Sequence, residues 1–569
     1  MAHAGITLHV KGLNDTLTAA VVSTVQLSQY KNHQVTEAQV RHLFAQAPDQ
    51  VQAALRPYGY FDARVDGSIK QVGDDWDVTL DVDPGEPVRV TAIHIEVPEK
   101  AATLPPVHYA IRRFKPDKGD ILNQGQYAAS RDAINASIVA NGFLDAQMTR
   151  HRVAVTRADR SAVVDLAWDV GQRYRFGKVH FEGSQFRPGF LKRYIPWKPG
   201  DYYKQDQLLG LQQLLNGADY FSVVNVEPDV EHKHDGIVDV NVDLKPAKRS
   251  VYTGGPFIGT DTGLGIQLGL ERRWVNDRGH KWKNHLVLAQ RLKMLSSLYS
   301  IPLPGGHQRA WNFGANFRDA DTDTSHSKTL ELVANQTWLW HGWLVTAGVH
   351  ALSGTFTVGQ RGNEPDDTPG IEHGNSTLVY PEISLVKKQG DNPTFVRHGW
   401  SLTVAARSTA GKLLSDANFS QLVANAKWIH AFNRRNRLLV RMDAGITRTN
   451  DFSALPPQLR FFAGGSRSNR GYGYQALGPR NQYDRVIGGT RLLAAGVTVE
   501  HYFTSKWGMA AFVDAGNAFN GTDFRPRIGA GLGLRWLSPV GMIRLDLGTP
   551  IHNDRHSGIQ LNIVIGPDL

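Results

Sequence analysis

Residues 527–548 read RIGAGLGLRWLSPVGMIRLDLG, and this stretch decides the fold. Before the short turn at SPVG, apolar residues occupy every second position: Ile528, Ala530, Leu532, Leu534 and Trp536. After the turn, apolar and charged residues alternate along MIRLDLG. A period of two sends successive side chains to opposite faces of a β-strand. The stretch therefore predicts a hairpin with one apolar face and one face that carries Arg535, Arg544 and Asp546.

The alternation extends over the second half of the chain, from Val251 onward. GIQLNIVIG at residues 558–566 places Ile559, Leu561, Ile563 and Ile565 in one phase. A soluble β-sandwich has the same period, because its inward face is also apolar. About 320 residues at roughly 20 per strand and loop correspond to about 16 strands, with long polar segments alternating with tight turns. Length and loops thus favour a transmembrane antiparallel β-barrel of about 16 strands.

The first half contains three similar segments. LRPYGYFDARV (55–65), IVANGFLDAQM (138–148) and LNGADYFSVVNV (215–226) each run from a helix end through an aromatic residue into a strand. With Gly59, Gly142 and Asp219 taken as equivalent, the offsets are 83 and 77 residues. Between the strands lie helical stretches such as VTEAQVRHLFAQ, where Thr36 can cap the helix and Val40, Leu43 and Phe44 share one face. This pattern predicts three α+β modules, each with a mixed sheet and two helices.

Two interpretations of the modules remain open. They are either plain spacers, or a series of exposed sheet edges on which another chain can add a strand.

Composition limits the classes of function. The chain has 569 residues, no Cys and a net charge of +10, and its basic residues are scattered among acidic ones. The absence of any run of five basic residues disfavours nucleic acid as a partner. No 18 consecutive apolar residues occur, so no transmembrane helix is predicted. The N-terminus, MAHAGITLHVKGL, has neither the basic nor the apolar region of a signal peptide.

Motifs for catalysis and cofactors are weak. GLGIQLG at 263–269 has the wrong spacing for a dinucleotide-binding loop and lies in an alternating strand. EHKHD at 231–235 falls at a hairpin tip, and no HExxH or GxSxG motif is present. We therefore predict no catalytic residues, no cofactor site, no metal site and no enzymatic activity.

A glycine-rich stretch, GGSRSNRGYGYQALGP at 464–479, raises a separate question. It is compatible with a phosphate-binding loop, a nucleic-acid patch, a solvated loop, or a loop folded into a cavity of the protein. In MAAFVDAGNAF at 509–519, the alternation places Ala510, Phe512 and Asp514 toward the barrel lumen, where a carboxylate needs a partner.

These features together resemble the Omp85 superfamily, whose α+β modules are called POTRA domains. NRGYGYQALGP is similar to the family's loop-6 motif, MAAFVDAGNAF to its FDxG strand motif, and GAGLGLRWLSPVGMIRLDLGTPI to its penultimate hairpin. Three modules, YSIPLPG at 299–305 and the ending IVIGPDL point within the superfamily to its TamA branch. The resemblance implies POTRA domains at 5–87, 88–172 and 173–248, followed by a barrel at 249–569.

The resemblance also implies a site. Loop 6 is expected to fold back into the barrel, where Arg470 pairs with Asp514 while Gly471 and Gly473 let the backbone approach the wall. Tyr472 belongs to the same motif, and Gly516 to the FDxG motif. Four further charged residues are lumen candidates, each expected to be a solvated charge on the pore wall: Glu500, Arg535, Arg544 and Asp546. Arg467 is expected to be an ordinary loop charge.

The implied function is insertion and assembly of β-barrel proteins, such as autotransporters, into the cell outer membrane. A seam between the first strand, near Val251 to Gly259, and the last, Ile559 to Ile565, would open laterally, and Gly566 and Pro567 would weaken its closure. Expected partners are unfolded outer-membrane proteins, outer-membrane lipid and an inner-membrane-anchored TamB-like protein that docks on periplasmic POTRA domains. We expect the family's signal peptide to be missing from this numbering.

The alternative function is a secretion pore of the two-partner type, which passes an unfolded protein through its lumen. Such pores usually carry two POTRA domains and a plug helix, so three modules without an evident plug favour the assembly factor.

Overall fold

The structure is a computed structural model that describes residues 5–31, 33–73, 75–304, 308–362, 364–365, 367–392, 395–409, 411, 414–538, 541–551, 558–566 and 568. The chain forms two compact units. The first comprises the residues up to Glu182 together with Pro196–Gln212 and Asn225–Val242, and the second comprises Gly183–Ile195, Gln213–Val224 and the chain from Asp243 onward. In the described ranges, no helix has the length and apolar character that a membrane span requires.

The first module contains a three-stranded mixed sheet with the order β1-β3-β2. Strand β1 runs parallel to β3, and β2 runs antiparallel to it. Its elements are β1 (Ile6–Lys11), α1 (Asp15–Thr24), η1 (Gln26–Tyr30), α2 (Glu37–Leu55), η2 (Arg56–Tyr58), β2 (Arg64–Val72) and β3 (Asp75–Asp83). Helix α2 begins with the predicted cap: Thr36 and Gln39 form a capping box, and Val40 and Leu43 are buried.

The second and third modules have the same strand order, β4-β6-β5 and β7-β9-β8, and in the second β4 runs parallel to β6 and β5 antiparallel to it. The third module differs from the prediction of two helices in each, because its described residues form one α-helix and one short 3-10 helix. The second consists of β4 (Arg89–Glu96), α3 (Glu99–Ala102), α4 (Pro105–Arg112), α5 (Gln124–Ala140), β5 (Gln147–Thr156) and β6 (Ser161–Asp169). The third consists of β7 (Arg175–Glu182), η3 (Leu191–Tyr194), α6 (Gln205–Gly217), β8 (Phe221–Pro228) and β9 (Ile237–Pro246).

One backbone feature explains the sequence repeat. The three equivalent positions after the long helices all have left-handed backbone conformations, with φ of 89° at Gly59, 102° at Gly142 and 59° at Asp219. Glycine adopts this conformation without a steric penalty, and Asp is among the few other residues that tolerate it. Each therefore ends its helix and directs the chain into the next strand.

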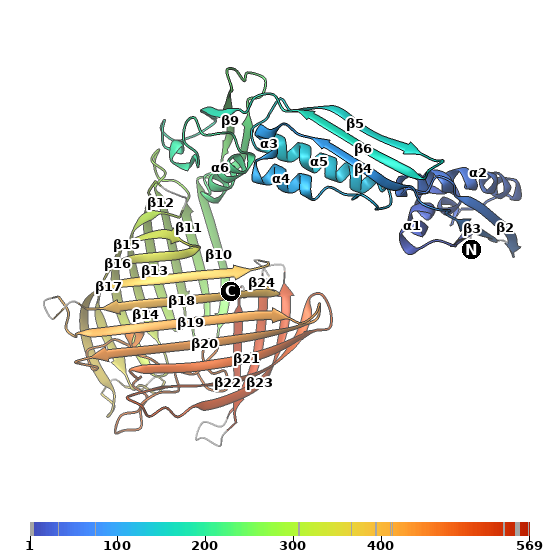
Figure 1. The fold of residues 1–569 in the computed structure, drawn as a ribbon. Coiled ribbons are helices and arrows are strands. Elements are labelled where there is room, and N and C mark those ends of the chain that lie inside the picture. Colours follow the sequence, from blue (N-terminus) through green and yellow to red (C-terminus); the bar gives the residue numbers. More distant parts are fainter. Residues whose placement is uncertain are drawn as a thin grey trace. The chain divides into compact units, whose positions relative to one another are not determined.

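The second half forms one sheet of 16 strands, β10 to β25, in which each strand pairs with the next along the chain (Figure 1). The predicted architecture, three α+β modules followed by an antiparallel barrel of about 16 strands, is confirmed. The strands are β10 (Ser250–Gly259), β11 (Gly263–Arg272), β12 (Lys281–Ala289), β13 (Leu292–Pro302), β14 (Ala310–Asp321), β15 (Ser325–Trp340), β16 (Trp343–Val358), β17 (Glu372–Gly390), β18 (His398–Ser408), β19 (Phe419–Ala431), β20 (Asn436–Thr449), β21 (Arg491–Tyr502), β22 (Trp507–Phe519), β23 (Arg527–Ser538), β24 (Gly541–Pro550) and β25 (Gln560–Ile565), with the short helix η4 (Pro457–Leu459) before β21.

The outer face of this sheet is apolar and carries a band of tryptophans. Partly exposed tryptophans gather at the end of the barrel where β10 begins, next to the short turns: Trp282, Trp311, Trp340, Trp428, Trp507 and Trp536. Trp507 and Trp536 stack with their ring centroids 5.3 Å apart. An apolar outer wall with an aromatic girdle at its rim is typical of a barrel in a lipid bilayer.

The second compact unit also contains a junction between the barrel rim and two segments, Gly183–Ile195 and Gln213–Val224. Phe186, Phe190 and Tyr220 pack together as an aromatic cluster. The Tyr220 hydroxyl donates to the carbonyl of Gly279, and Arg193 donates to the carbonyl of Pro302 at 2.9 Å. A Cβ atom at Gly279 would lie 2.2 Å from the Phe190 ring, so only glycine fits there. These contacts join part of the third module to the barrel rim.

Candidate functional site: a charged cluster inside the barrel

Loop 6, the segment between β20 and β21 (residues 450–490), lies inside the barrel rather than in solvent. Ser468, Asn469, Arg470 and Tyr472 are buried. The loop is paired with itself through isolated bridges, of which one joins Ala463 to Leu477. Tyr472 packs against this bridge in a small apolar cluster. Among the four alternatives for this glycine-rich stretch, the structure shows a loop folded into a cavity of the protein.

Arg470 is the centre of the loop's polar contacts. Its Nε and Nη2 atoms donate to the two carboxylate oxygens of Asp514 at 2.8 and 2.9 Å, and its backbone N–H donates to the same group at 3.0 Å. The remaining guanidinium donors reach Asp546 at 3.0 Å and Thr498 at 2.9 Å. The guanidinium also lies 3.6 Å from the centroid of the Phe512 ring. This bidentate, charge-assisted pairing fixes the orientation as well as the position of Arg470.

Glycine contacts explain how the loop backbone comes so near the wall. A Cβ atom at Gly471 would lie 2.7 Å from the Cα of Gly529 and 2.8 Å from the carbonyl oxygen of Thr549. A Cβ atom at Gly548 would lie 2.5 Å from the carbonyl oxygen of Arg470. Gly473 differs from the expectation, because the nearest atoms to its Cβ position are 3.8 Å away. The approach to the wall therefore depends on Gly471 and not on Gly473.

Gly516 belongs to the barrel wall and not to loop 6. It lies on β22, where a Cβ atom would come within 2.6 Å of the Cα of Ala494 on β21. Gly516 thus allows two neighbouring strands to pack closely, and it does not contact Arg470.

The four secondary lumen residues join the same cluster. Asp546 binds Arg535 at 2.6 Å, Arg535 binds Glu500 at 2.6 Å, and Glu500 binds Arg437 at 2.6 Å. Glu500 is 0% exposed, Arg535 1% and Asp546 4%. The expectation that these three are solvated charges on a pore wall is therefore wrong, because loop 6 and neighbouring side chains fill this part of the lumen. Arg544 pairs with Asp568 and is also largely enclosed.

The cluster contains residues that the sequence did not single out. Arg441 contacts Asp514 at 2.8 Å, and Arg437 contacts Asp568 at 2.7 Å. Arg437 and Arg441 share the inward phase of β20, so the alternation in NRLLVRMDAG was a usable signal. Asp568 follows the last strand, where alternation gives no prediction. Positive and negative groups alternate along the cluster, which offsets the cost of burying them.

The last strand is held weakly by its neighbours. Strand β25 pairs with β24 over six residues, and no ladder joins the described residues of β25 to β10, although some of their Cα atoms lie within 8 Å. The outward residues Ile559 and Leu561 are exposed, and Ile563 is partly exposed. Inward-facing Asn562 donates to the carbonyl of Arg470 at 3.0 Å. Gly566 has a φ of 152°, and Pro567 lies outside the described residues.

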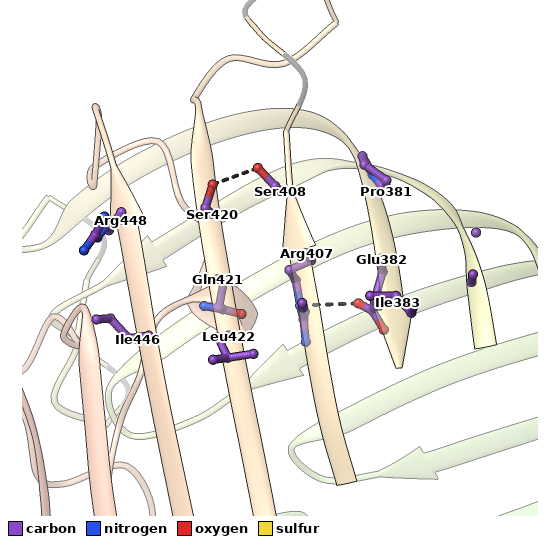
Figure 2. A pocket seen from close by; sticks show the side chains of 13 residues that line it. Pro381, Glu382, Ile383, Arg407, Ser408, Ser420, Gln421, Leu422, Ile446 and Arg448 are labelled. Carbon is purple, nitrogen blue, oxygen red and sulfur yellow. Dashed lines mark hydrogen bonds and ion pairs between the residues drawn. The ribbon is translucent and has the colours of Figure 1, made fainter. Parts of the chain in front are cut away.

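A groove of about 640 Å³ lies on the outer wall over β16 to β20 (Figure 2). Exposed Ile383 and Leu422 contribute to its apolar lining. Two of its charged residues, Glu382 and Arg407, pair with each other at 3.3 Å. The groove is therefore an uneven part of an apolar wall and holds no reactive group.

No metal site is found in the part of the chain that the structure describes, because no three His, Asp or Glu side chains gather suitably there. The EHKHD segment lies at the hairpin between β8 and β9, where His232 contacts Asp229 at 2.8 Å.

Comparisons with known proteins follow the same division of the chain. The model of the Omp85 superfamily domain matches residues 278–566. The model of POTRA domain TamA domain 1 matches residues 7–84, and a POTRA model described as a surface antigen variable number repeat matches residues 174–247.

Two curated relatives are outer membrane protein assembly factors BamA. The one from Nitratidesulfovibrio vulgaris is 23% identical over 432 residues, which cover 71% of this chain and 53% of the relative. The one from Neisseria meningitidis serogroup B is 21% identical over 189 residues, which cover 30% of this chain and 23% of the relative. The chain thus spans about half the length of the first relative and less of the second.

Among solved structures, BamA from Haemophilus ducreyi lacking POTRA domains 1–3 has the same fold. The TM-score is 0.69 at 17% identity, and the match covers 84% of this chain and 99% of that chain.

Proposed function

The chain belongs to the Omp85 superfamily, and from this premise we propose that it inserts and assembles β-barrel proteins, including autotransporters, in the outer membrane. In this proposal the barrel spans the outer membrane and the POTRA modules lie in the periplasm. The physical problem is that a strand edge in lipid leaves backbone groups unpaired, at a cost of several kcal/mol each. A barrel that opens its own seam offers an edge on which the incoming strand can pair.

The observation that carries this proposal is the state of the last strand. Strand β25 has only six residues of ladder, all with β24, and among the described residues none with β10. The outward edge of β25 thus has free donors and acceptors where an incoming strand could pair.

The charged cluster supports the proposal by linking strands β20 to β24 from inside the barrel. Arg470 and Asp514 fasten loop 6 to β22, and Asp546 extends the contact to β24. With β20 to β24 held in this way, movement is concentrated at the seam next to β25. In this proposal loop 6 is an internal brace, and its arginine is structural rather than catalytic.

A TamB-like, inner-membrane-anchored protein is the proposed partner of the POTRA modules. The match of the first module to a TamA-type POTRA domain supports this assignment. Strand β2 is an edge of the first sheet and most of its residues are exposed. It therefore offers a backbone edge for strand addition by the partner.

A disulfide across the seam tests the function. Tyr252 on β10 and Ile565 on β25 are exposed on the outer face near the same end of the barrel, and the chain has no native Cys. Tyr252→Cys with Ile565→Cys should form a disulfide that abolishes assembly of a β-barrel substrate in proteoliposomes, and reduction should restore it.

Leu545→Cys with Ile563→Cys is the matched control, because these residues are ladder partners on β24 and β25. It joins the last strand to its existing neighbour and leaves the seam free, so activity should persist. If assembly proceeds at the normal rate with the seam locked, the lateral mechanism is wrong. A two-partner secretion pore would pass its substrate equally well in both states.

A further inference from the structure

The groove over β16 to β20 lies where two strands of the wall separate. Strand β17 pairs with β18 only from Glu382 onward, whereas its ladder with β16 continues on the other side of this residue. Pro381 has no N–H with which the ladder to β18 could continue. Beyond it, the backbone N–H of Val379 donates at 2.9 Å to the hydroxyl of Ser415, in the loop between β18 and β19. The wall is therefore indented at Pro381, and the loop covers the edge of β17.

The apolar lining of the groove is one row of ladder partners. The row crosses β16 to β20 in the order Ala347, Ile383, Ala406, Leu422 and Ile446. Exposed Ile383 and Leu422 show that the row faces outward, and the two alanines leave a hollow between these larger side chains (Figure 2). A hollow of about 640 Å³ in a lipid-facing wall fits hydrocarbon and not a polar solute.

The next row, away from the tryptophan band, is polar. Ser408 pairs with Ser420 in the ladder, their hydroxyl oxygens are 2.7 Å apart, and Ser420 pairs in turn with Arg448 (Figure 2). All three line the groove, and Arg448 is exposed. Among the described residues Arg448 has no ion pair, whereas Glu382 and Arg407 neutralise each other. The guanidinium of Arg448 is therefore available to an anion in the groove.

The position of this polar row along the barrel matches the headgroup layer of a bilayer. Trp428 of the tryptophan band and Ser420 share the outward phase of β19 and lie eight residues apart. At a rise of about 3.4 Å per residue and a strand tilt of about 40°, this separation is about 21 Å along the membrane normal. The apolar band of such barrels is about 25 Å tall, and an Arg side chain extends past its own backbone toward the headgroups. Arg448 therefore reaches the phosphate level of the leaflet opposite the tryptophan band.

We propose that this groove binds lipid A, the phosphorylated acyl glycolipid of the outer leaflet, with an acyl chain on the apolar row and a phosphate on Arg448. The guanidinium offers a phosphate two parallel hydrogen bonds. When Ser408 donates to Ser420, the O–H of Ser420 is available to a further phosphate oxygen. A phosphate monoester, with almost two negative charges and three acceptor oxygens, suits this row better than the diester of a phospholipid. The choice of leaflet rests on the outer-membrane location proposed above.

Native mass spectrometry of the full chain, released from detergent micelles to which lipid A has been added, measures this binding. The unaltered chain should retain one lipid A molecule. Arg448→Ala should weaken the apparent affinity at least about tenfold, which corresponds to about 1.4 kcal/mol. Ala406→Trp should weaken it to a similar extent, because the indole fills the space that the acyl chain needs.

Two matched controls lie on the same outer wall. Lys328→Ala removes an exposed cation of β15 that lies outside the groove and already has Asp319 at 4.0 Å. Ala426→Trp adds an indole at an exposed position of β19 outside the groove. Both should keep the affinity of the unaltered chain. Heat-modifiable mobility on a gel verifies that each variant has a barrel, and if Ala406→Trp lacks one, Ala347→Leu replaces it.

The outcomes are distinct. Unaltered affinity for lipid A in folded Arg448→Ala, or in the folded groove-filling variant, overturns the site. Equally tight binding of phosphatidylglycerol overturns the assignment to lipid A, and equally tight binding of uncharged phosphatidylcholine overturns the role of Arg448. The measurement contains no β-barrel substrate, so its failure leaves the proposed assembly function standing. In the same way, failure of the seam-locking experiment leaves the lipid site standing.

Discussion

The pair formed by Arg470 and Asp514 should contribute a large coupling energy to barrel stability. Asp514 is 0% exposed and accepts three hydrogen bonds from Arg470, so removal of either partner leaves a desolvated charge. Breaking such a buried pair costs about 3 to 5 kcal/mol. Arg441 remains beside Asp514 at 2.8 Å and compensates in part when Arg470 is removed. We therefore expect a coupling energy of about 1 to 3 kcal/mol.

The assay is a double-mutant cycle with Arg470→Ala, Asp514→Ala and the double variant. Urea unfolding in lipid vesicles, followed by tryptophan fluorescence, gives the free energy of unfolding of each. The same cycle on Arg525 and Asp523, 3.0 Å apart but exposed, should give no more than about 1 kcal/mol. A coupling energy for the buried pair as small as that of the exposed pair would refute the view that Arg470 fastens loop 6 to the wall.

Three further predictions concern single positions. Gly471→Ala should displace loop 6 and lower the free energy of unfolding by about 1 to 3 kcal/mol. Gly473→Ala should leave it unchanged, because the nearest atoms to a Cβ at this position are 3.8 Å away. Protease cleavage within loop 6 should increase in the first variant and not in the second. Thr36→Ala removes the capping box of α2 and should lower the unfolding free energy of the first module by about 1 kcal/mol, measured by urea unfolding. The Tyr174 hydroxyl is the main cause of the lowered pKa of Asp145, and nearby Lys233 contributes. The ionised carboxylate therefore stabilises the fold at pH values above the ordinary pKa of Asp. This stabilisation is lost as the pH falls through the lowered pKa of Asp145. Tyr174→Phe should raise the Asp145 pKa in an NMR titration; an unchanged value would contradict the assignment.

The alternation of side chains, together with the length and the loops of the second half, predicted the barrel, because lipid imposes one rule on the whole outer wall. Met509 and Val513 are exposed outward and Asp514 is buried inward, as the period of two requires. The repeat of the modules was visible for a comparable reason. The left-handed conformation at Gly59 and Gly142 restricts the residue type after each helix, so the same signature recurs.

Alternation alone could not predict what fills the lumen. It places Glu500 and Arg535 inward, but whether an inward charge meets water or a partner depends on loop 6, which is distant in sequence. Arg470 could be assigned to Asp514 only through the family resemblance. Asp568 was missed because it lies beyond the last strand, where its position depends on a bend in the chain and on cations contributed by β19, β20 and β24.

The aromatic junction at the barrel rim bears on how the protein can be divided experimentally. A fragment that starts near residue 249 has the complete sheet but lacks Phe190 and Tyr220, which cover Gly279 and the adjoining rim. Such a fragment would uncover Trp274, which packs against Phe186, and the carbonyl of Gly279, and it should aggregate during refolding. A chimaera that exchanges modules should place its splice site before Arg175, so that β7 stays in one sheet with β8 and β9 and the aromatic residues of the junction stay with their own barrel.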